Sequence, residues 1–403
     1  MNYRELPPST RDLSRVAAIV GVGESDYGDD YRAARARAEG YVPPTPEGLA
    51  ITVFERALAD AGLLRSDIDG LAVAFMYGGP TAEETAGLLG IQPRYLTNTI
   101  GIMAGIVPRA VGAIASGECD TIALVYAVAT RSIGRKFGGQ NFAEGGGAPA
   151  SYYYYHPWGW SSQAAHWAMT WQYYRHLYGL AEDGLAPVAM QLRDNARRHA
   201  QAIMQTEITP DAYTQARYVV QPLRLLDLCL VNDGGVCLII TRADKARDTA
   251  KTPVAIAGWG SATVKADKLD ALVRQQLRPQ FQHAGAQTLA MAGLSLSDVR
   301  HFEAYDAATI HLVNHIEGHG FAEPGTAIDA FRLGEFGQGG RVGINTAGGM
   351  LSGSYMHGWN SCAEIVRQLR HEAGDRQVPD VESSLFSLAE TDRVSPVLFT
   401  RGA

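Results

Sequence analysis

Residues 340–358, GRVGINTAGGMLSGSYMHG, hold a tyrosine and a histidine within a run of small residues. Glycine lets a backbone turn tightly and approach a ligand closely, and Tyr355 stands where this backbone is loosest, with His357 two residues behind it. A phenol has a pKa of about 10, so removing its proton at pH 7 costs about 4 kcal/mol. Tyr355 could act as a base only if a neighbouring donor or a helix N-terminus lowered its pKa; otherwise it would donate a hydrogen bond.

A second pair of candidates, Tyr305 and Asp306, lies in the segment EAYDAAT. Most of the 18 tyrosines of the chain should simply pack with one polar end in water, so sequence context and not residue type selects Tyr305 and Tyr355. Asp306 remains a catalytic candidate, although we favour a structural hydrogen-bonding role for it. His357 could polarise a substrate oxygen, or serve packing.

The composition excludes several classes of protein. The net charge is -7 and no block of five or six like charges occurs, which argues against nucleic acid or an anionic membrane surface as a partner. The four cysteines form neither a CxxC motif nor a Cys/His cluster of zinc spacing, so neither a zinc site nor a disulfide framework is expected. No apolar run of 18 residues and no apolar signal core is present. We therefore expect a cytoplasmic protein with reduced thiols.

Two further patterns have alternative interpretations. His311, His315 and His319 recur every four residues, which could form a metal stripe, but a solvated or interface face of a helix is the better interpretation, and no metal is expected. The aromatic run Tyr152–Tyr155 with Trp158 and Trp160 could stack on a flat substrate or pack against another chain. The glycine clusters match no phosphate loop or dinucleotide fingerprint.

Apolar patterning places these residues on alternating strands and helices. Residues 130–190 interrupt the alternation and predict a long excursion that covers a site or a subunit interface. Residues 222–241 predict two strands joined by a turn at 232–235, Asn-Asp-Gly-Gly. The other predicted strands are 15–23, 68–75 and 120–129, and the predicted helices are 46–63, 107–114, 163–177 and 185–202.

The second half of the chain repeats the first. Three segments recur in the same order: 253–261 echoes 15–25, 288–299 echoes 57–68, and 345–353 echoes 98–105. Three echoes in register indicate duplication of a unit of strands and helices, and each unit should be a layered α/β domain with a mostly parallel sheet. The predicted organisation is an N-terminal arm (1–14), a first half (15–248) and a second half (249–403).

A duplicated α/β chain with glycine-rich segments at matched places resembles the thiolase superfamily over nearly its whole length. The matching segments are IASGECDTIALV at 114–125, PLRLLDLCLVNDGG, EAYDAAT at 303–309, and 340–358, which resembles the thiolase segment NxxGGxxxxGHPxGxxG. The resemblance implies a thiolase-like fold, usually dimeric, that uses a cysteine nucleophile to carry acyl groups.

The catalytic positions of that family have changed here. By the family's spacing the nucleophile would stand at or near Ile100, and NTIGIMAGI contains no cysteine. Tyr355 replaces the histidine of the GHP motif, and Tyr305 stands where thiolases have an asparagine or histidine. The Tyr305-Asp306 pair and the GGxLSxxYxHG pattern at 348–358 resemble the steroid side-chain-cleaving aldolases, a branch that lost the cysteine and uses tyrosines.

This resemblance implies retro-aldol cleavage of a β-hydroxyacyl-CoA, from a steroid or a similar bulky compound, to a ketone or aldehyde and a shorter acyl-CoA. Such a reaction needs a base and donors around the thioester oxygen, but no nucleophile and no cofactor beyond the coenzyme A of the substrate. We assign the base to Tyr355 and the donor or relay to Tyr305. Gly348, Gly349, Ser354 and Met103 are the candidate substrate-binding residues.

The same resemblance implies a homodimer and a small partner chain made of an OB-fold and a zinc ribbon. Two other functions stay open at this point. One is an acyltransferase that works without cysteine, and the other is a non-catalytic carrier of acyl-CoA or lipid. Acyl transfer to the protein would favour the first, and ligand binding without turnover would favour the second.

Overall fold

A central sheet of eleven strands organises the chain in the computed structural model, which describes residues 13–75, 78–99, 103–135, 162–263, 277–389 and 393–402. A separate two-stranded sheet pairs β5 (Tyr218–Val220) with β6 (Leu223–Arg224). The strands of the large sheet are β1 (Ala17–Glu24), β2 (Gly70–Ala74), β3 (Tyr95–Thr99), β4 (Thr121–Ala129), β7 (Asp233–Arg242), β8 (Val254–Trp259), β9 (Ala262–Thr263), β10 (His301–Ala304), β11 (Gly343–Ile344), β12 (Ser383–Ala389) and β13 (Arg393–Arg401).

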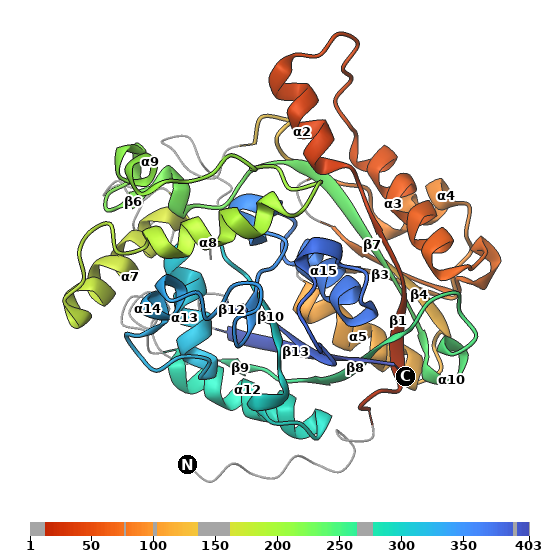
Figure 1. Cartoon of the computed structure of the whole chain (residues 1–403). Coiled ribbons are helices and arrows are strands. Elements are labelled where there is room, and N and C mark those ends of the chain that lie inside the picture. The colour runs from red at the N-terminus through yellow and green to blue at the C-terminus, as the bar shows by residue number, and fades with distance from the viewer. Residues whose placement is uncertain are drawn as a thin grey trace.

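Helices cover both faces of this sheet (Figure 1). They are α2 (Tyr27–Ala36), α3 (Pro46–Ala61), α4 (Ala82–Leu89), α5 (Met103–Ala115), α7 (Gln163–Tyr178), α8 (Ala186–Arg197), α9 (Pro210–Gln215), α10 (Ala243–Ala246), α12 (Arg278–Ala292), α13 (Thr309–His319), α14 (Ala327–Arg332) and α15 (Trp359–Arg370). A π-helical turn spans Gly349–Gly353. No helix within the described ranges has both the length and the apolarity needed to span a bilayer.

The order of strands in the sheet repeats about its centre. From the neighbouring strands β1 and β8, one half runs β1-β7-β4-β2-β3 and the other runs β8-β13-β12-β10-β11. The echoed segments occupy matching places, because β8 corresponds to β1 and β11 corresponds to β3. The α/β fold with two duplicated halves is therefore confirmed, whereas the residue at which one half ends stays a prediction.

The prediction of a mostly parallel sheet is wrong. β2 runs parallel to β3 and β4, and β10 runs parallel to β11 and β12. The pairs formed by β1, β7, β8 and β13 are antiparallel. A strand buried on both faces carries a continuous apolar pattern whichever way it runs, so patterning could not reveal the direction of these central strands.

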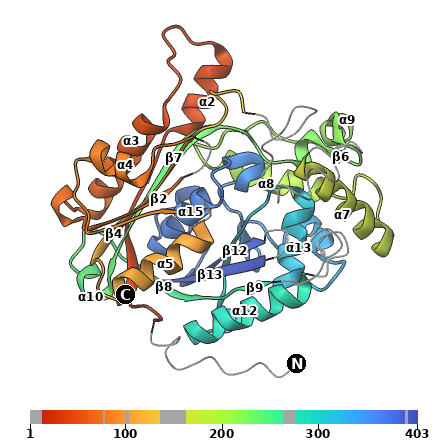
Figure 2. The same ribbon diagram turned by 180° about the vertical axis from the view of Figure 1, so that it is seen from behind.

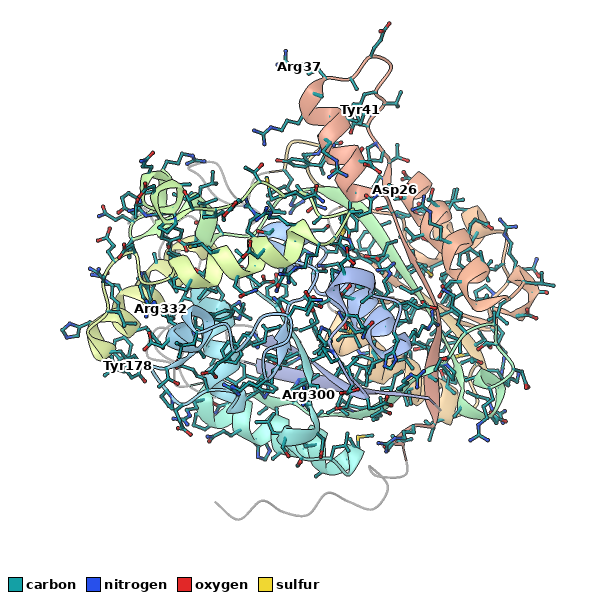
Figure 3. The ribbon with its side chains drawn as sticks, viewed as in Figure 1. Asp26, Arg37, Tyr41, Tyr178, Arg300 and Arg332 are labelled. Atoms are coloured by element: carbon teal, nitrogen blue, oxygen red, sulfur yellow. The ribbon has the colours of Figure 1, made fainter. Side chains whose placement is uncertain are left out.

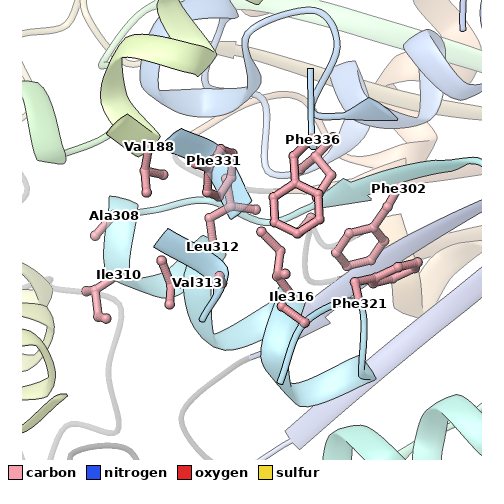
Figure 4. Packing of buried hydrophobic residues seen from close by; sticks show 14 of the residues in the cluster. Val188, Phe302, Ala308, Ile310, Leu312, Val313, Ile316, Phe321, Phe331 and Phe336 are labelled. Atoms are coloured by element: carbon pink, nitrogen blue, oxygen red, sulfur yellow. The ribbon is translucent and has the colours of Figure 1, made fainter. Parts of the chain in front are cut away.

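Five layers result from this arrangement (Figures 1 and 2). α3 and α4 pack on the outer face of the first half of the sheet, and α12 and α13 pack on the outer face of the second. α5 and α15 lie between the two halves and share one apolar core with both. Figure 4 shows the outer core of the second half, where Phe302 of β10 meets Ile316 of α13 and Phe321. Charged side chains such as those of Arg37 and Arg332 lie on the outside of the molecule (Figure 3).

The predicted turn at 232–235 is also wrong. Asp233–Arg242 is the single strand β7, which pairs with β4 on one side and β1 on the other. The glycines lie where neighbouring groups approach the strand closely, since a Cβ on Gly234 would lie 1.8 Å from the terminal carbon of Met356 and a Cβ on Gly235 would lie 2.9 Å from the carbonyl oxygen of Tyr126. Glycine within a strand can mark a close approach of neighbouring groups as well as a reversal of the chain, and here the chain does not reverse.

The structure describes one helix, α7, within the predicted excursion at 130–190, and a second helix, α8, that begins near its end and continues past it. α7 and α8 lie where helices were predicted, although α8 ends at Arg197 and not near 202. Both pack with α13 and α14 in the outer core of the second half. Tyr152–Tyr155, Trp158 and Trp160 lie outside the described residues, as do Ile100 and most of the N-terminal arm.

Candidate active site

Four side chains form a continuous line of hydrogen bonds between the two halves of the molecule. The hydroxyl oxygens of Tyr305 and Tyr355 are 2.8 Å apart, and the Tyr355 oxygen lies 2.9 Å from Nε2 of His357. Nδ1 of His357 lies 2.8 Å from the hydroxyl of Tyr126. We call these four residues the tyrosine–histidine row. Three of them were predicted as site residues, and the structure brings all three into direct contact.

Tyr126 is the member that the sequence interpretation missed. It lies in the middle of β4, whose nine residues are all buried, and the apolar pattern of 120–129 predicts only a buried strand. One signal was present, because a buried tyrosine hydroxyl usually has a hydrogen-bond partner. No sequence pattern could name that partner, since His357 is 231 positions away.

Access to the row falls from one end to the other. Tyr305 is half-buried, Tyr355 is 9% exposed, His357 is 4% exposed and Tyr126 is inaccessible. Tyr305 follows β10, and its backbone N–H donates to the carbonyl of Ser387 in β12. A substrate can therefore meet the row at the two tyrosines that were predicted to do the chemistry, with His357 and Tyr126 behind them.

A strained turn delivers Tyr355 and His357 to this position. Gly348 and Gly349 have φ of 92° and 58°, and the π-helical turn that follows ends just before Ser354. His357 itself has φ of 50°, in the left-handed region that side chains other than glycine seldom adopt. Such backbone conformations cost about 1–3 kcal/mol each and persist only where the surroundings hold them.

Asp306 is one of the groups that hold the turn. Its Oδ1 accepts a hydrogen bond of 2.8 Å from the backbone N–H of Met350, and its Oδ2 lies so close to Gly349 that a Cβ there would be 2.2 Å away. Burial raises the pKa of Asp306 well above its ordinary value. These contacts agree with the structural role favoured for Asp306, and they place its carboxyl beside the turn and not within the row.

Two asparagines fix the loops that carry the tyrosines. Asn232 accepts from the backbone N–H of Tyr355 at 2.8 Å and donates to the hydroxyl of Ser354 at 3.1 Å. Asn345, with φ of 44°, accepts from the N–H of Ala304 and donates to its carbonyl. Neither asparagine was predicted as a site residue. The sequence predicts Asn232 in a turn, and only the fold shows that its side chain reaches the loop that carries Tyr355.

The four candidate substrate-binding residues are all buried. Gly348 packs against Ala196 of α8, where a Cβ would lie 2.5 Å from the alanine Cβ. Ser354 is 1% exposed and accepts from Asn232, and Met103 begins α5 with no exposed surface. Gly348, Gly349 and Ser354 make contacts that hold the loop of Tyr355, and the role of all four residues toward substrate stays a prediction.

His357 is a neutral imidazole at ordinary pH. Burial lowers its pKa to about 3, so the ring carries one proton, and one nitrogen donates while the other accepts. The hydroxyls at both nitrogens satisfy either arrangement. The row is therefore an uncharged network in which the position of each proton depends on its neighbour.

The prediction of a solvated or interface face for the histidines at 311, 315 and 319 is wrong, because His311 and His315 are buried within the chain and His319 is half-buried. Nε2 of His311 lies 3.2 Å from Nε2 of His315, and the hydroxyl of Ser387 contacts both His315 and His319, at 3.0 and 2.7 Å. We call these four residues the histidine–serine stack. Spacing of four residues marks one helix face but cannot tell which face is buried, and α13 is covered by α7, α12 and α14. Burial lowers the pKa of His311 and of His319 to about 3.

Comparison with known proteins identifies the family. A model described as thiolase C-terminal domain-like matches residues 261–389. The chain is 33% identical over 371 residues to the 17-hydroxy-3-oxo-4-pregnene-20-carboxyl-CoA lyase of Mycobacterium tuberculosis. This match covers 89% of this chain and 92% of that protein. The chain belongs to the thiolase superfamily. It is also 31% identical over 372 residues to the steroid side-chain-cleaving aldolase of Thermomonospora curvata, across 89% of this chain and 91% of that protein.

Solved structures agree with this assignment to the thiolase superfamily. The Ltp2–ChsH2(DUF35) aldolase superposes with a TM-score of 0.83 at 28% identity, and covers 96% of this chain and 98% of that chain. The monomeric SCP2-thiolase-like protein type 1 of Mycobacterium smegmatis superposes with a TM-score of 0.68 at 18% identity, over 96% of this chain and 77% of that one, which shows the fold alone. The resemblance to thiolases and to their aldolase branch is confirmed.

The cysteines of this thiolase-like chain are not placed for acyl transfer. Cys119, Cys237 and Cys362 are buried and Cys229 is half-buried, and none is paired in a disulfide. Burial raises the pKa of Cys119 and of Cys229 to about 12, and that of the other two thiols further. A thiol, unlike a thiolate, is a poor nucleophile. Thiolase chemistry through any of these four residues is therefore disfavoured.

Proposed function

We propose that the chain is an aldolase-type lyase that cleaves the Cα–Cβ bond of a β-hydroxyacyl-CoA whose acyl group is a steroid or a similarly bulky compound. The observation that carries this proposal is the tyrosine–histidine row, which places two phenols in contact at the accessible end of a neutral hydrogen-bonded network. Relatives that are 33% and 31% identical are named as lyase and aldolase of steroid side chains.

In the proposed reaction Tyr355 first loses its own phenolic proton to solvent, and the resulting phenolate removes the proton of the β-hydroxyl group. The electrons of that O–H bond form the new carbonyl, the Cα–Cβ bond breaks, and its electron pair passes to the thioester as an enolate. A proton then returns to Cα, which yields a shorter acyl-CoA and a ketone or aldehyde. Charging Tyr355 costs about 4 kcal/mol at pH 7 for an ordinary phenol, and hydrogen bonds donated to its oxygen reduce that cost.

Tyr305 is the donor in this scheme. It is the more exposed of the two phenols and lies 2.8 Å from the oxygen of Tyr355. In that place its O–H can stabilise either the Tyr355 phenolate or the developing enolate oxygen, at no cost of charging. No metal and no cofactor other than the coenzyme A of the substrate enters the scheme.

The proposal includes a partner chain and a second copy of this one. The solved aldolase of the same fold is named as a complex with a DUF35 chain, which supports a small partner protein, expected to be an OB-fold with a zinc ribbon. β3 ends the sheet with no further strand beside it in the described part of the chain, and its Leu96 is 36% exposed. An unpaired edge of this kind is open to pairing with another chain, here a second copy. We expect the assembly to act in the cytoplasm.

The test is an assay of the complex co-purified from its native host against a panel of β-hydroxyacyl-CoA esters with steroid and smaller acyl groups. Mass spectrometry should detect the shortened acyl-CoA and an equal amount of the ketone or aldehyde. The chain without its partner serves as the control for dependence on the complex. Failure of the complete complex to cleave any ester would overturn the proposal.

A further inference from the structure

Tyr126 and His357 form the inner end of the row and have no role yet in the proposed reaction. The His357 ring is neutral and lies between two hydroxyls, with Nε2 2.9 Å from Tyr355 and Nδ1 2.8 Å from Tyr126. Its single proton can stand on either nitrogen. The two tautomers have opposite effects on Tyr355, because one presents an N–H to the phenol oxygen and the other presents a lone pair.

The proposed base requires the first of these tautomers. If the proton is on Nε2, the ring donates to the oxygen of Tyr355 and stabilises the phenolate as it forms. If the proton is on Nδ1, a lone pair faces the phenolate at 2.9 Å and disfavours it. The Nε2–H tautomer leaves Nδ1 as an acceptor, and the hydroxyl of Tyr126 lies at donor distance from it.

Tyr126 is held rigidly enough to serve as this donor. Its backbone lies within the ladder between β4 and β7, opposite Val236. Its ring stacks on Trp359, with centroids 5.7 Å apart. Trp359 begins α15, only two residues after His357, and its backbone N–H donates to the carbonyl of Met356. One tyrosine of the first half thus contacts the imidazole and the helix start of the catalytic loop in the second half.

We infer that Tyr126 is a positioning residue that fixes His357 as the Nε2–H tautomer, so that the ring donates to Tyr355. The inference rests on the proposed function, in which Tyr355 becomes negatively charged. The group that holds His357 in this tautomer is then the phenol of Tyr126, which comes from the other half of the duplicated fold. A carboxylate in this place would instead draw the proton to Nδ1, since an ionised carboxylate only accepts hydrogen bonds.

The tautomer can be read directly by nitrogen NMR of the wild-type protein with ¹⁵N-labelled histidine. The chain has 11 histidines, and the His357 signals are those absent from the spectrum of His357→Gln. We expect a pyridine-type shift at Nδ1 and a pyrrole-type shift at Nε2. The reverse pattern overturns the inference. This measurement needs no turnover, so it is separate from failure of the proposed function, which would appear as an inactive wild-type complex.

The kinetic test is Tyr126→Phe, which removes one hydroxyl and keeps the ring. Because Tyr126 does not reach the accessible end of the row, we expect KM to stay within about twofold. We expect kcat to fall about tenfold or more, the size found for hydrogen-bond partners that orient metal-ligating histidines. His357 should then show mixed nitrogen shifts. Unchanged kcat in a folded variant with unchanged shifts overturns the inference.

A matched control is Tyr174→Phe. Tyr174 is equally buried and its hydroxyl donates to Glu317 at 2.6 Å, away from the row. This variant loses a buried hydroxyl of the same kind, so its thermal unfolding should shift comparably while its kcat stays that of the wild type. If both variants lose kcat in proportion to their loss of stability, Tyr126 serves only to support the fold and the inference fails.

Discussion

The tyrosine–histidine row and the histidine–serine stack lie side by side and have much in common. Each is largely buried, with one half-buried member, and each is a line of hydrogen bonds through neutral imidazoles. The rings of Tyr305 and His311 meet with centroids 5.7 Å apart. They differ in access and in the acidity of their hydroxyls. Solvent reaches the row at its two tyrosines, of which Tyr305 is half-buried and Tyr355 is slightly exposed. The stack joins its histidines through Ser387, and Trp167 covers His311 with ring centroids 4.0 Å apart.

The comparison indicates that histidine content does not identify the site. A serine hydroxyl has no accessible charged form near neutral pH, whereas a phenol can be ionised at a cost of about 4 kcal/mol. The row also stands on a strained turn, and the stack stands on the regular helix α13. Strain of this kind tends to occur at functional sites. We therefore expect substitutions in the row to change rate and substitutions in the stack to change stability.

Tyr355→Phe should show the largest effect. It removes the proposed base and leaves the ring, so the complex should bind acyl-CoA normally and lose at least about 10²-fold in kcat, the size expected for one acid/base group. Binding is measured by calorimetry with the substrate ester and turnover by product formation. Retention of full activity would remove Tyr355 from the mechanism, and a wild-type complex that binds but turns nothing over would instead favour the carrier function.

Gly349→Ala tests the support of the row through Asp306. The new Cβ would lie 2.2 Å from Oδ2 of Asp306, at a backbone φ of 58°. The turn must shift, so we expect a stability loss of about 1–3 kcal/mol together with a fall in kcat. Gly90→Ala is the control, since Gly90 has φ of 65° but open space around it. That variant should lose stability by backbone strain alone, and its kcat should stay unchanged.

His315→Leu, in the histidine–serine stack, should lower stability and leave kcat nearly unchanged. It leaves Nε2 of His311 and one contact of Ser387 without their partner, which costs about 1–3 kcal/mol for a buried polar group. Urea unfolding should record this loss, and kcat at a temperature where the variant is folded should stay within about twofold of the wild type. A loss of kcat as large as that of Tyr355→Phe would mean that the two networks act as one site.

The sequence was sufficient for the part of the site that is local in the chain. Tyr355 was located by counting from the paired glycines at 348 and 349, and His357 follows it by two residues in the same loop. Tyr305 was located by the short segment EAYDAAT. Tyr126 and Asn232 act on the same loop from 231 and 123 positions away, and only the folded arrangement of the two halves brings them there. The errors have a similar cause. Periodicity identified α13 and β7 as elements, but the burial of α13 and the direction of β7 are set by what packs beside them.

The dependence of stability on pH is where the row and the stack should agree. Burial lowers the pKa of His357 and of His311 from 6.5 to about 3. Between those values the unfolded chain binds a proton that the folded chain excludes, so stability is full above pH 6.5 and falls as the pH falls toward 3, by about 1.4 kcal/mol per pH unit for each histidine. The raised pKa of Asp306 makes its contribution to stability decrease as the pH rises, which is opposite in sign to that of the histidines. Asp306 is unchanged in all the variants compared, so it does not alter the difference between them.

His357→Gln and His311→Gln should therefore flatten the slope of unfolding free energy against pH by the same amount. Urea unfolding of both variants and the wild type at pH 6.5 and 5.5 measures it, with a difference of about 1 kcal/mol expected in each case. If the two variants have equal slopes and unequal kcat, burial lowers the pKa of both histidines to the same extent. The difference in rate then arises from the tyrosines that neighbour His357. A slope unchanged in His357→Gln alone would mean that the row already holds a charged imidazole, and the neutral network on which the base assignment depends would have to be abandoned.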